Sequence, residues 1–358
     1  MLRFMARRLV LLIPVAIGIL LVTFLIVRLI PGDPCVAMLG ERATPTKCEE
    51  FKERYGLNDN VFVQFVRYIG NMAQGDFGES IRFSRPVSDI IAERLPMTIE
   101  LTLFAMLFST TVGIFLGIIS ALKPNSFTDT VTMVVANVGV SMPVFWLGLM
   151  LAYFFALVMK DTPFFIPPSG RLGASVTLVN LAKEWGLTEL TGIPKFAVYF
   201  LSNSAIANSI ITGNWATLKD ALWHLILPSV AVGTIPLAII ARMTRSTLVE
   251  VMQQDYVRTA RAKGVKERNV VSGHAMSNVM IPVITIIGIE TGALLSGAVL
   301  TETVFALPGV GTMLVQSILS RDYPVVQGFT LIIAVIFVLI NLFVDVSYAY
   351  LDPRVRLE

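Results

Sequence analysis

Acidic side chains inside long apolar runs are the first candidates for chemistry in this sequence. Glu290 lies near the middle of the run IIGIETGALLSG, and Asp345 follows Asn341 by one turn in the last apolar run. Ionised groups are costly inside a membrane, so such residues commonly line a solute path or bond between helices. We therefore predict Glu290, Asn341 and Asp345 as candidates for a translocation path, where Glu290 would favour cationic groups. A glutamate hydrogen-bonded between helices is an equally weighted alternative for Glu290.

Two other features qualify this prediction. Glu100 lies near the start of an earlier apolar run, where we expect it simply to reach water. Small residues surround Glu290, and we expect them to serve close helix packing rather than solute contact. They are Gly288, Gly292, Ala293, Ser296 and Gly297.

A basic stretch between Val249 and Pro282 is the second candidate. It contains Arg258, Arg261, Lys263, Lys266 and Arg268. We expect Asp255 to cap a short helix from Tyr256 to Lys263, because aspartate accepts backbone N–H bonds at a helix start. Gly264 is expected to end the helix in a left-handed conformation.

A helix of this length is not stable alone in water, so it needs a partner surface. We expect Tyr256, Thr259 and Ala260 to contribute to that contact, with Tyr256 and Ala260 on one face filling an apolar notch. Arg258 and Arg261 would pair with carboxylates of the partner. The alternative is that these arginines only set the membrane topology or bind anionic lipid.

The remaining chemistry is sparse. The sequence has no GxxxxGK[ST] phosphate-binding loop, no HExxH, no GxSxG and no CxxC pattern, so we expect no catalytic site, no metal and no cofactor bound by this chain. Cys35 and Cys48 are the two cysteines. On the oxidising side of a membrane they would form a disulfide, and two free thiols are the alternative.

Composition indicates an integral membrane protein. Hydrophobic residues make up 55% of the 358 residues and charged residues 15%, against about 25% charged in soluble domains. The net charge of +3 argues against a nucleic-acid surface. A retained first span is predicted from 9 to 30, because the run is long enough to cross a bilayer and lacks a small-residue cleavage site.

Five further spans are predicted. They cover about 97–122, 129–158, 222–241, 278–300 and 325–350. Pro124 and Pro143 should bracket or kink the third, and the segment 193–212 is too polar to be another span. Six spans place both termini in the cytoplasm, together with the seven Lys/Arg residues between Arg242 and Arg268.

Several segments together resemble a known family. DYVRTARAKGV followed by HAMSNVMIPVIT is similar to the cytoplasmic loop of ABC-transporter permeases of the dipeptide/oligopeptide/nickel class. IPGDP at 30–34, GDFG at 75–78, SMPVFW at 141–146, RMTRS at 242–246, LTETVF at 300–305 and RDYPVVQG at 321–328 match other parts of the same family. The resemblance covers nearly the whole chain and is greatest to the first of the two dipeptide permease subunits.

This resemblance implies an all-α type I importer fold with six spans. Residues 1–96 would hold the first span and an outer helical segment, 97–350 the transmembrane domain and 351–358 a cytoplasmic tail. Within the domain, 160–222 would be an outer insertion and 242–277 the coupling loop, whose 255–264 helix docks on the ATPase. Two departures from the wider family concern this loop: Arg258 occupies the position of a glutamate, and Pro282 lies further from Gly264.

The implied function is ATP-driven import of short peptides across a bacterial inner membrane. Partners would be a second, homologous permease, two ATPase subunits that bind ATP and Mg²⁺, a periplasmic or lipoprotein substrate-binding protein, and membrane lipid. Glutathione, nickel complexes and other small solutes are alternative cargo. A stand-alone secondary carrier is the competing class, although the sequence shows no inverted repeat.

Overall fold

The computed structural model describes residues 2–29, 35–36, 43–54 and 56–351. Regular structure in these ranges is helical, apart from an isolated antiparallel bridge between Glu79 and Pro86. The predicted all-α class is confirmed.

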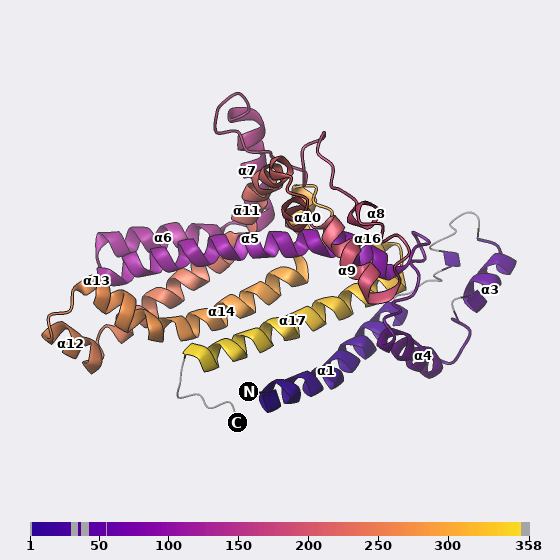
Figure 1. Cartoon of the computed structure of the whole chain (residues 1–358), viewed down its shortest axis with the longest axis horizontal. Coiled ribbons are helices and arrows are strands. Elements are labelled where there is room, and N and C mark those ends of the chain that lie inside the picture. The colour runs from indigo at the N-terminus through magenta and orange to yellow at the C-terminus, as the bar shows by residue number, and fades with distance from the viewer. Residues whose placement is uncertain (1, 30–34, 37–42, 55, 352–358) are drawn as a thin grey trace.

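Long helices form the body of the molecule (Figure 1). They are α1 (Leu2–Leu29), α5 (Val87–Leu122), α11 (Trp215–Val251), α14 (Met276–Gly297) and α17 (Tyr323–Leu351). Within the described residues, four helices are long and apolar enough to cross a membrane, or five if one bent pair is a single span. The exact number of six spans stays a prediction.

Two helices extend beyond the spans that were predicted within them. α5 begins at Val87 rather than Met97 and includes Pro96. α11 spans Trp215–Val251 rather than 222–241 and includes two prolines. Membrane helices tolerate proline, since neighbouring helices and polar side chains satisfy the freed backbone carbonyl.

The third apolar run is broken at Pro143. It forms α6 (Phe127–Ser141) and then α7 (Val144–Tyr153), which continues into the π-helical η2 (Phe154–Val158) at an angle of 98° to α6. Met142, the residue before the proline, is extended, as steric contact with a proline ring favours. The expected kink is therefore confirmed, and α7 stands out from the bundle (Figure 1).

Small residues bring α5 and α11 close together. A Cβ atom on Gly117 would lie 2.7 Å from the carbonyl oxygen of Ala241. The Ser109 hydroxyl donates a 2.6 Å hydrogen bond to the carbonyl of Gly233. Such contacts replace the hydrophobic driving force that is missing between helices in lipid.

Short helices form the outer segments. α3 (Pro45–Arg54) and α4 (Val61–Ala73) precede α5, and both lie in the region where the resemblance implies an outer helical segment. Phe65 of α4 contacts Phe24 of α1, with ring centroids 5.1 Å apart. Cys35 and Cys48 form a disulfide.

The insertion at 160–222 also contains short helices. They are α8 (Leu181–Glu184), α9 (Gly192–Asn203) and α10 (Ala205–Ile211). The chain breaks between α9 and α10 at Ser204, whose hydroxyl accepts a bond from the backbone N–H of Ala207. The segment 193–212 is thus not a continuous span, as predicted.

The elements separate towards two ends of the molecule. α12 (Asp255–Ala262) and α13 (Glu267–Asn269) lie at one end, and α3, α4, α9 and α16 (Val310–Leu319) lie towards the other (Figure 1). The start of α1 and the end of α17 point towards the α12 end.

Candidate functional site: the α12 surface

Local sequence sets the limits of α12. The helix ends in a left-handed Gly264 with φ of 79°. The N–H of Gly264 bonds to the Arg261 carbonyl, and the N–H of Val265 bonds to the Ala260 carbonyl. These are the two bonds of a Schellman C-cap, so the predicted role of Gly264 is confirmed.

The predicted cap at the other end is wrong. Gln254 occupies the N-cap position without a side-chain bond, and Asp255 is the first helical residue. Its carboxylate instead faces Arg258 at 3.4 Å. An acidic residue in the first turn still interacts favourably with the helix dipole.

One face of α12 is buried within this chain. Val257 and Ala260, the latter 8% exposed, belong to one apolar cluster with Leu248 of α11 and Val271 of η3 (Val270–Ala275). The prediction that Ala260 shares a partner-facing surface with Tyr256 is therefore wrong. Ala260 packs α12 against α11 and η3 of this chain.

The rest of the α12 surface carries exposed polar side chains. Tyr256 is exposed, and its hydroxyl accepts a 2.6 Å bond from the Asn278 amide of α14. The Arg258 side chain is 70% exposed, and Thr259 lies beside it, also exposed. This surface offers a phenol, a guanidinium and a hydroxyl to a partner.

Arg261 is engaged within the chain. Its guanidinium donates to Glu267 with bonds of 3.1 and 2.6 Å. This hydrogen bonding raises the pKa of Arg261, so the guanidinium stays charged. The expected pairing of Arg261 with a partner carboxylate would compete with an existing bidentate pair, which leaves Arg258 as the more available arginine.

The candidates for a translocation path lie on α14 and α17. Glu290 is half-buried on α14, and the Asn341 amide donates to the carbonyl of Phe337. Asp345, one turn further along α17, is also half-buried. Gly288 packs against Val344 of α17. Since residues are about 100° apart around a helix, Glu290 points away from this contact, and the structure does not bring it onto the face that meets α17.

The expectation for Glu100 is wrong. It is 5% exposed and accepts bonds from Arg171, Ser204 and the backbone N–H of Ile206, at 2.9, 2.8 and 2.9 Å. Arg171 lies in the 160–222 insertion, so this carboxylate fastens the insertion to α5. An unpaired carboxylate is costly to bury, so the position of Glu100 in an apolar run could have indicated that it has a buried partner.

Sequence reasoning missed a second buried carboxylate. Glu302 of α15 (Val299–Val304) is fully buried and accepts from the Thr98 hydroxyl at 2.7 Å and the Thr312 N–H at 3.0 Å. It joins α5 to the start of α16. Among the described residues, no cluster of His, Cys, Asp or Glu could hold a metal ion.

Comparisons with known proteins identify this architecture. Residues 113–357 match the family described as binding-protein-dependent transport system inner membrane component. Residues 1–102 match the family of N-terminal regions of such membrane components. The chain belongs to this permease family. It is therefore a non-catalytic, multi-pass component of the inner membrane that works with a binding protein and an ATPase, which excludes the stand-alone carrier.

Individual relatives cover the whole chain. The permease is 45% identical over 356 residues to the dipeptide transport system permease protein DppB of Alkalihalophilus pseudofirmus, covering 99% of this chain and 100% of that protein. It is 43% identical to the di/tripeptide transport system permease protein DppB of Pseudomonas aeruginosa and 41% identical to the dipeptide transport system permease protein DppB of Escherichia coli. Both of these alignments cover 99% of each chain.

Proposed function

We propose that this permease carries dipeptides and other short peptides inward in an ATP-driven importer. The observation that carries the proposal is its identity of 41–45%, over nearly full length, to relatives named as dipeptide permeases. Membrane components of one transport class share a solute path, so similarity along the entire chain favours the same class of solute.

We infer six spans with both termini in the cytoplasm. The spans would be α1, α5, the bent α6–α7 pair, α11, α14 and α17. Two observations support this topology: the start of α1 and the end of α17 point towards the α12 end (Figure 1), and seven Lys/Arg residues between Arg242 and Arg268 lie there. In domain terms, 97–350 is the transmembrane unit, with 160–222 outside and 242–277 as the coupling loop.

The exposed face of α12 is the proposed coupling surface. Tyr256, Arg258 and Thr259 would contact the ATPase, which binds ATP and Mg²⁺, while Val257 and Ala260 hold the helix to the permease body. Closure of two ATPase subunits would then move α11 and α14 through this buried attachment. A second, homologous permease would cover α7, where Trp146 and Tyr153 are exposed.

Uptake of a labelled dipeptide tests the substrate class. Cells of the source bacterium that lack this chain should lose uptake of labelled Ala-Ala, and the wild-type chain should restore it. Uptake of free alanine is the control, because it must be unaffected. Intact dipeptide uptake together with lost uptake of glutathione or a nickel complex would overturn the peptide class while leaving the permease family in place.

A further inference from the structure

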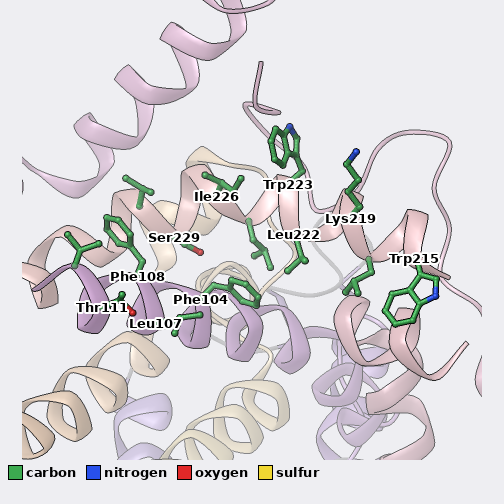
Figure 2. A pocket seen from close by; sticks show the side chains of 14 residues that line it. Phe104, Leu107, Phe108, Thr111, Trp215, Lys219, Leu222, Trp223, Ile226 and Ser229 are labelled. Carbon is green, nitrogen blue, oxygen red and sulfur yellow. The ribbon is translucent and has the colours of Figure 1, made fainter. Parts of the chain in front are cut away.

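An apolar groove lies between α5 and the first half of α11. Its volume is about 720 Å³. Figure 2 shows Phe104, Leu107 and Phe108 of α5 on one side and side chains of α11 along the other. This surface lies away from α12 and is not part of the coupling site described above.

On α11, the rim of the groove carries residue types that are typical of the interface between membrane and water. Trp215, Lys219 and Trp223 follow one another at intervals of four residues, so they share one face of the helix. The two tryptophans are 66% and 42% exposed, and the indole N–H of Trp223 donates to the carbonyl of Phe165 at 3.0 Å. Tryptophan is enriched where a membrane meets water, and lysine near a helix end extends its ammonium to the headgroups.

Beyond this rim the lining becomes apolar. Leu222, Ile226 and Val230 continue the α11 side, and Ser229 adds a buried hydroxyl without a hydrogen-bond partner among the described residues. The rise from Lys219 to Val230 is about 16 Å at 1.5 Å per residue. That is about half of the 30 Å hydrocarbon core, so the groove has the length of one leaflet.

Charge distinguishes between possible occupants. Lys219 is exposed and forms no ion pair within the part of the chain that the structure describes. The neighbouring Asp220 accepts instead from the backbone N–H of Gly173 at 2.7 Å. An apolar helix of another subunit would leave the ammonium of Lys219 without a counter-charge, whereas a phospholipid brings a phosphate to the rim and a hydrocarbon chain to the interior.

We propose that this groove binds one phospholipid of the outer leaflet. Its phosphate would accept from the ammonium of Lys219, and one acyl chain would lie between Phe104 and Phe108 of α5 and Ile226 of α11. An anionic phospholipid is favoured over phosphatidylethanolamine, because the latter carries an ammonium that competes for its own phosphate.

Quenching of Trp223 by a brominated lipid tests the site. The purified transporter complex would be placed in nanodiscs of phosphatidylethanolamine with increasing amounts of dibromo-phosphatidylglycerol. The fluorescence of Trp223 is obtained as the difference between the wild type and Trp223→Phe. We expect saturable quenching that needs about fivefold more bromolipid in Lys219→Ala, since one lysine at a membrane surface contributes about that factor. Lys219→Arg should keep the wild-type response.

Two controls separate this site from general contact with lipid. Lys183→Ala, on α8, removes another exposed lysine and should leave the titration unchanged. Ile226→Phe narrows the groove without adding a tryptophan and should abolish the saturable phase with Lys219 still present. An absence of Trp223 quenching in the intact complex would show that protein covers the groove and would overturn the proposal. Displacement of the bromolipid by inorganic phosphate alone would also overturn it, because the site would then recognise only a free anion.

Discussion

Arg245 of α11 binds Asp129 of α6 through two hydrogen bonds. Its Nε donates to Oδ1 at 2.7 Å and its Nη2 donates to Oδ2 at 2.5 Å. The same carboxylate accepts from the Ser120 hydroxyl and from the N–H of Asn125 at 2.8 Å. One buried aspartate thus fastens the turn between α5 and α6 to the helix that leads into α12.

Loss of this pair should destabilise the permease and impair transport. Removing one partner of a buried, hydrogen-bonded ion pair leaves an uncompensated charge, which costs about 3–5 kcal/mol. We expect both Asp129→Ala and Arg245→Ala to lower the midpoint of thermal unfolding in detergent. Arg245→Lys should have a midpoint only slightly above that of Arg245→Ala, because a lysine cannot donate the bidentate pair.

The double variant is the control for this pair. Asp129→Ala combined with Arg245→Ala should be less destabilised than the sum of the two single variants, since no buried charge is left unpaired. Strictly additive losses would show that the two side chains act independently.

Arg258→Glu should uncouple the ATPase without unfolding the permease. Its side chain is largely exposed, and its one ion pair with the described residues is to Asp255 at 3.4 Å, so reversing its charge alters the surface and not the core. We expect a loss of peptide uptake of at least tenfold, with an unchanged unfolding midpoint. Lys183→Glu, on α8, is the matched exposed control, and normal uptake by Arg258→Glu would remove this residue from the coupling surface.

Val257→Asp, unlike Arg258→Glu, should destabilise the protein as well as abolish transport. Val257 is fully buried in the cluster that joins α12 to α11 and α14, and an unpaired charge placed there is costly. We expect a lower unfolding midpoint together with lost transport. Full stability of Val257→Asp would mean that α12 does not pack on the permease body.

Substitutions of Gly264 test the C-terminal end of α12 alone. A Cβ atom on Gly264 would meet nothing within 4 Å, so a substitution affects only the left-handed backbone at φ of 79°. Gly264→Val should cost about 1–2 kcal/mol and reduce uptake, whereas Gly264→Asn should be milder because asparagine tolerates this conformation. Equal effects of the two substitutions, measured by unfolding and by uptake, would contradict the C-cap explanation.

Gly292 tests the contact between α14 and α17. A Cβ atom at this position would lie closer to the Phe337 ring than van der Waals contact allows. Gly292→Ala should therefore lower the unfolding midpoint, and Phe337→Leu in the same chain should restore part of it. Gly273→Ala, where a Cβ meets nothing within 4 Å, is the control. An unaffected Gly292→Ala protein would indicate looser packing of these helices.

Glu290→Gln tests the translocation path. The substitution keeps the size of the side chain and removes its charge. If Glu290 lines the path, Glu290→Gln should therefore slow uptake of Lys-containing dipeptides more than uptake of Ala-Ala. Competitive uptake assays measure the ratio of the two uptake rates. An equal change for both peptides would place Glu290 outside the path.

Local signals in the sequence predicted local structure well. Gly264 ends α12 within one residue of the expected position, because the left-handed preference of glycine depends only on its own backbone. Pro143 likewise marks the break in the third apolar run. The angle of 98° could not be predicted, since packing of α7 on α11 decides it.

Burial was less predictable than boundaries. Helical periodicity places Tyr256 and Ala260 near each other, but it does not say which face of α12 meets the chain's own core. Glu100 gives the same lesson, because its partner Arg171 comes from a segment 71 residues away. Contacts between distant segments depend on the assembled fold, and a single sequence does not encode them in any local pattern.

The π-helical η3 has a consequence for how chain length can vary. A π-turn contains one more residue than an α-turn, and η3 lies between α13 and α14. Loss of one residue there restores α-helical geometry and leaves α14 in place. A deletion inside α14 would instead rotate Gly288 and Gly292 by about 100°, away from Val344 and Phe337. We therefore expect a one-residue deletion to be tolerated within η3, beside α12, and to disrupt helix packing within α14.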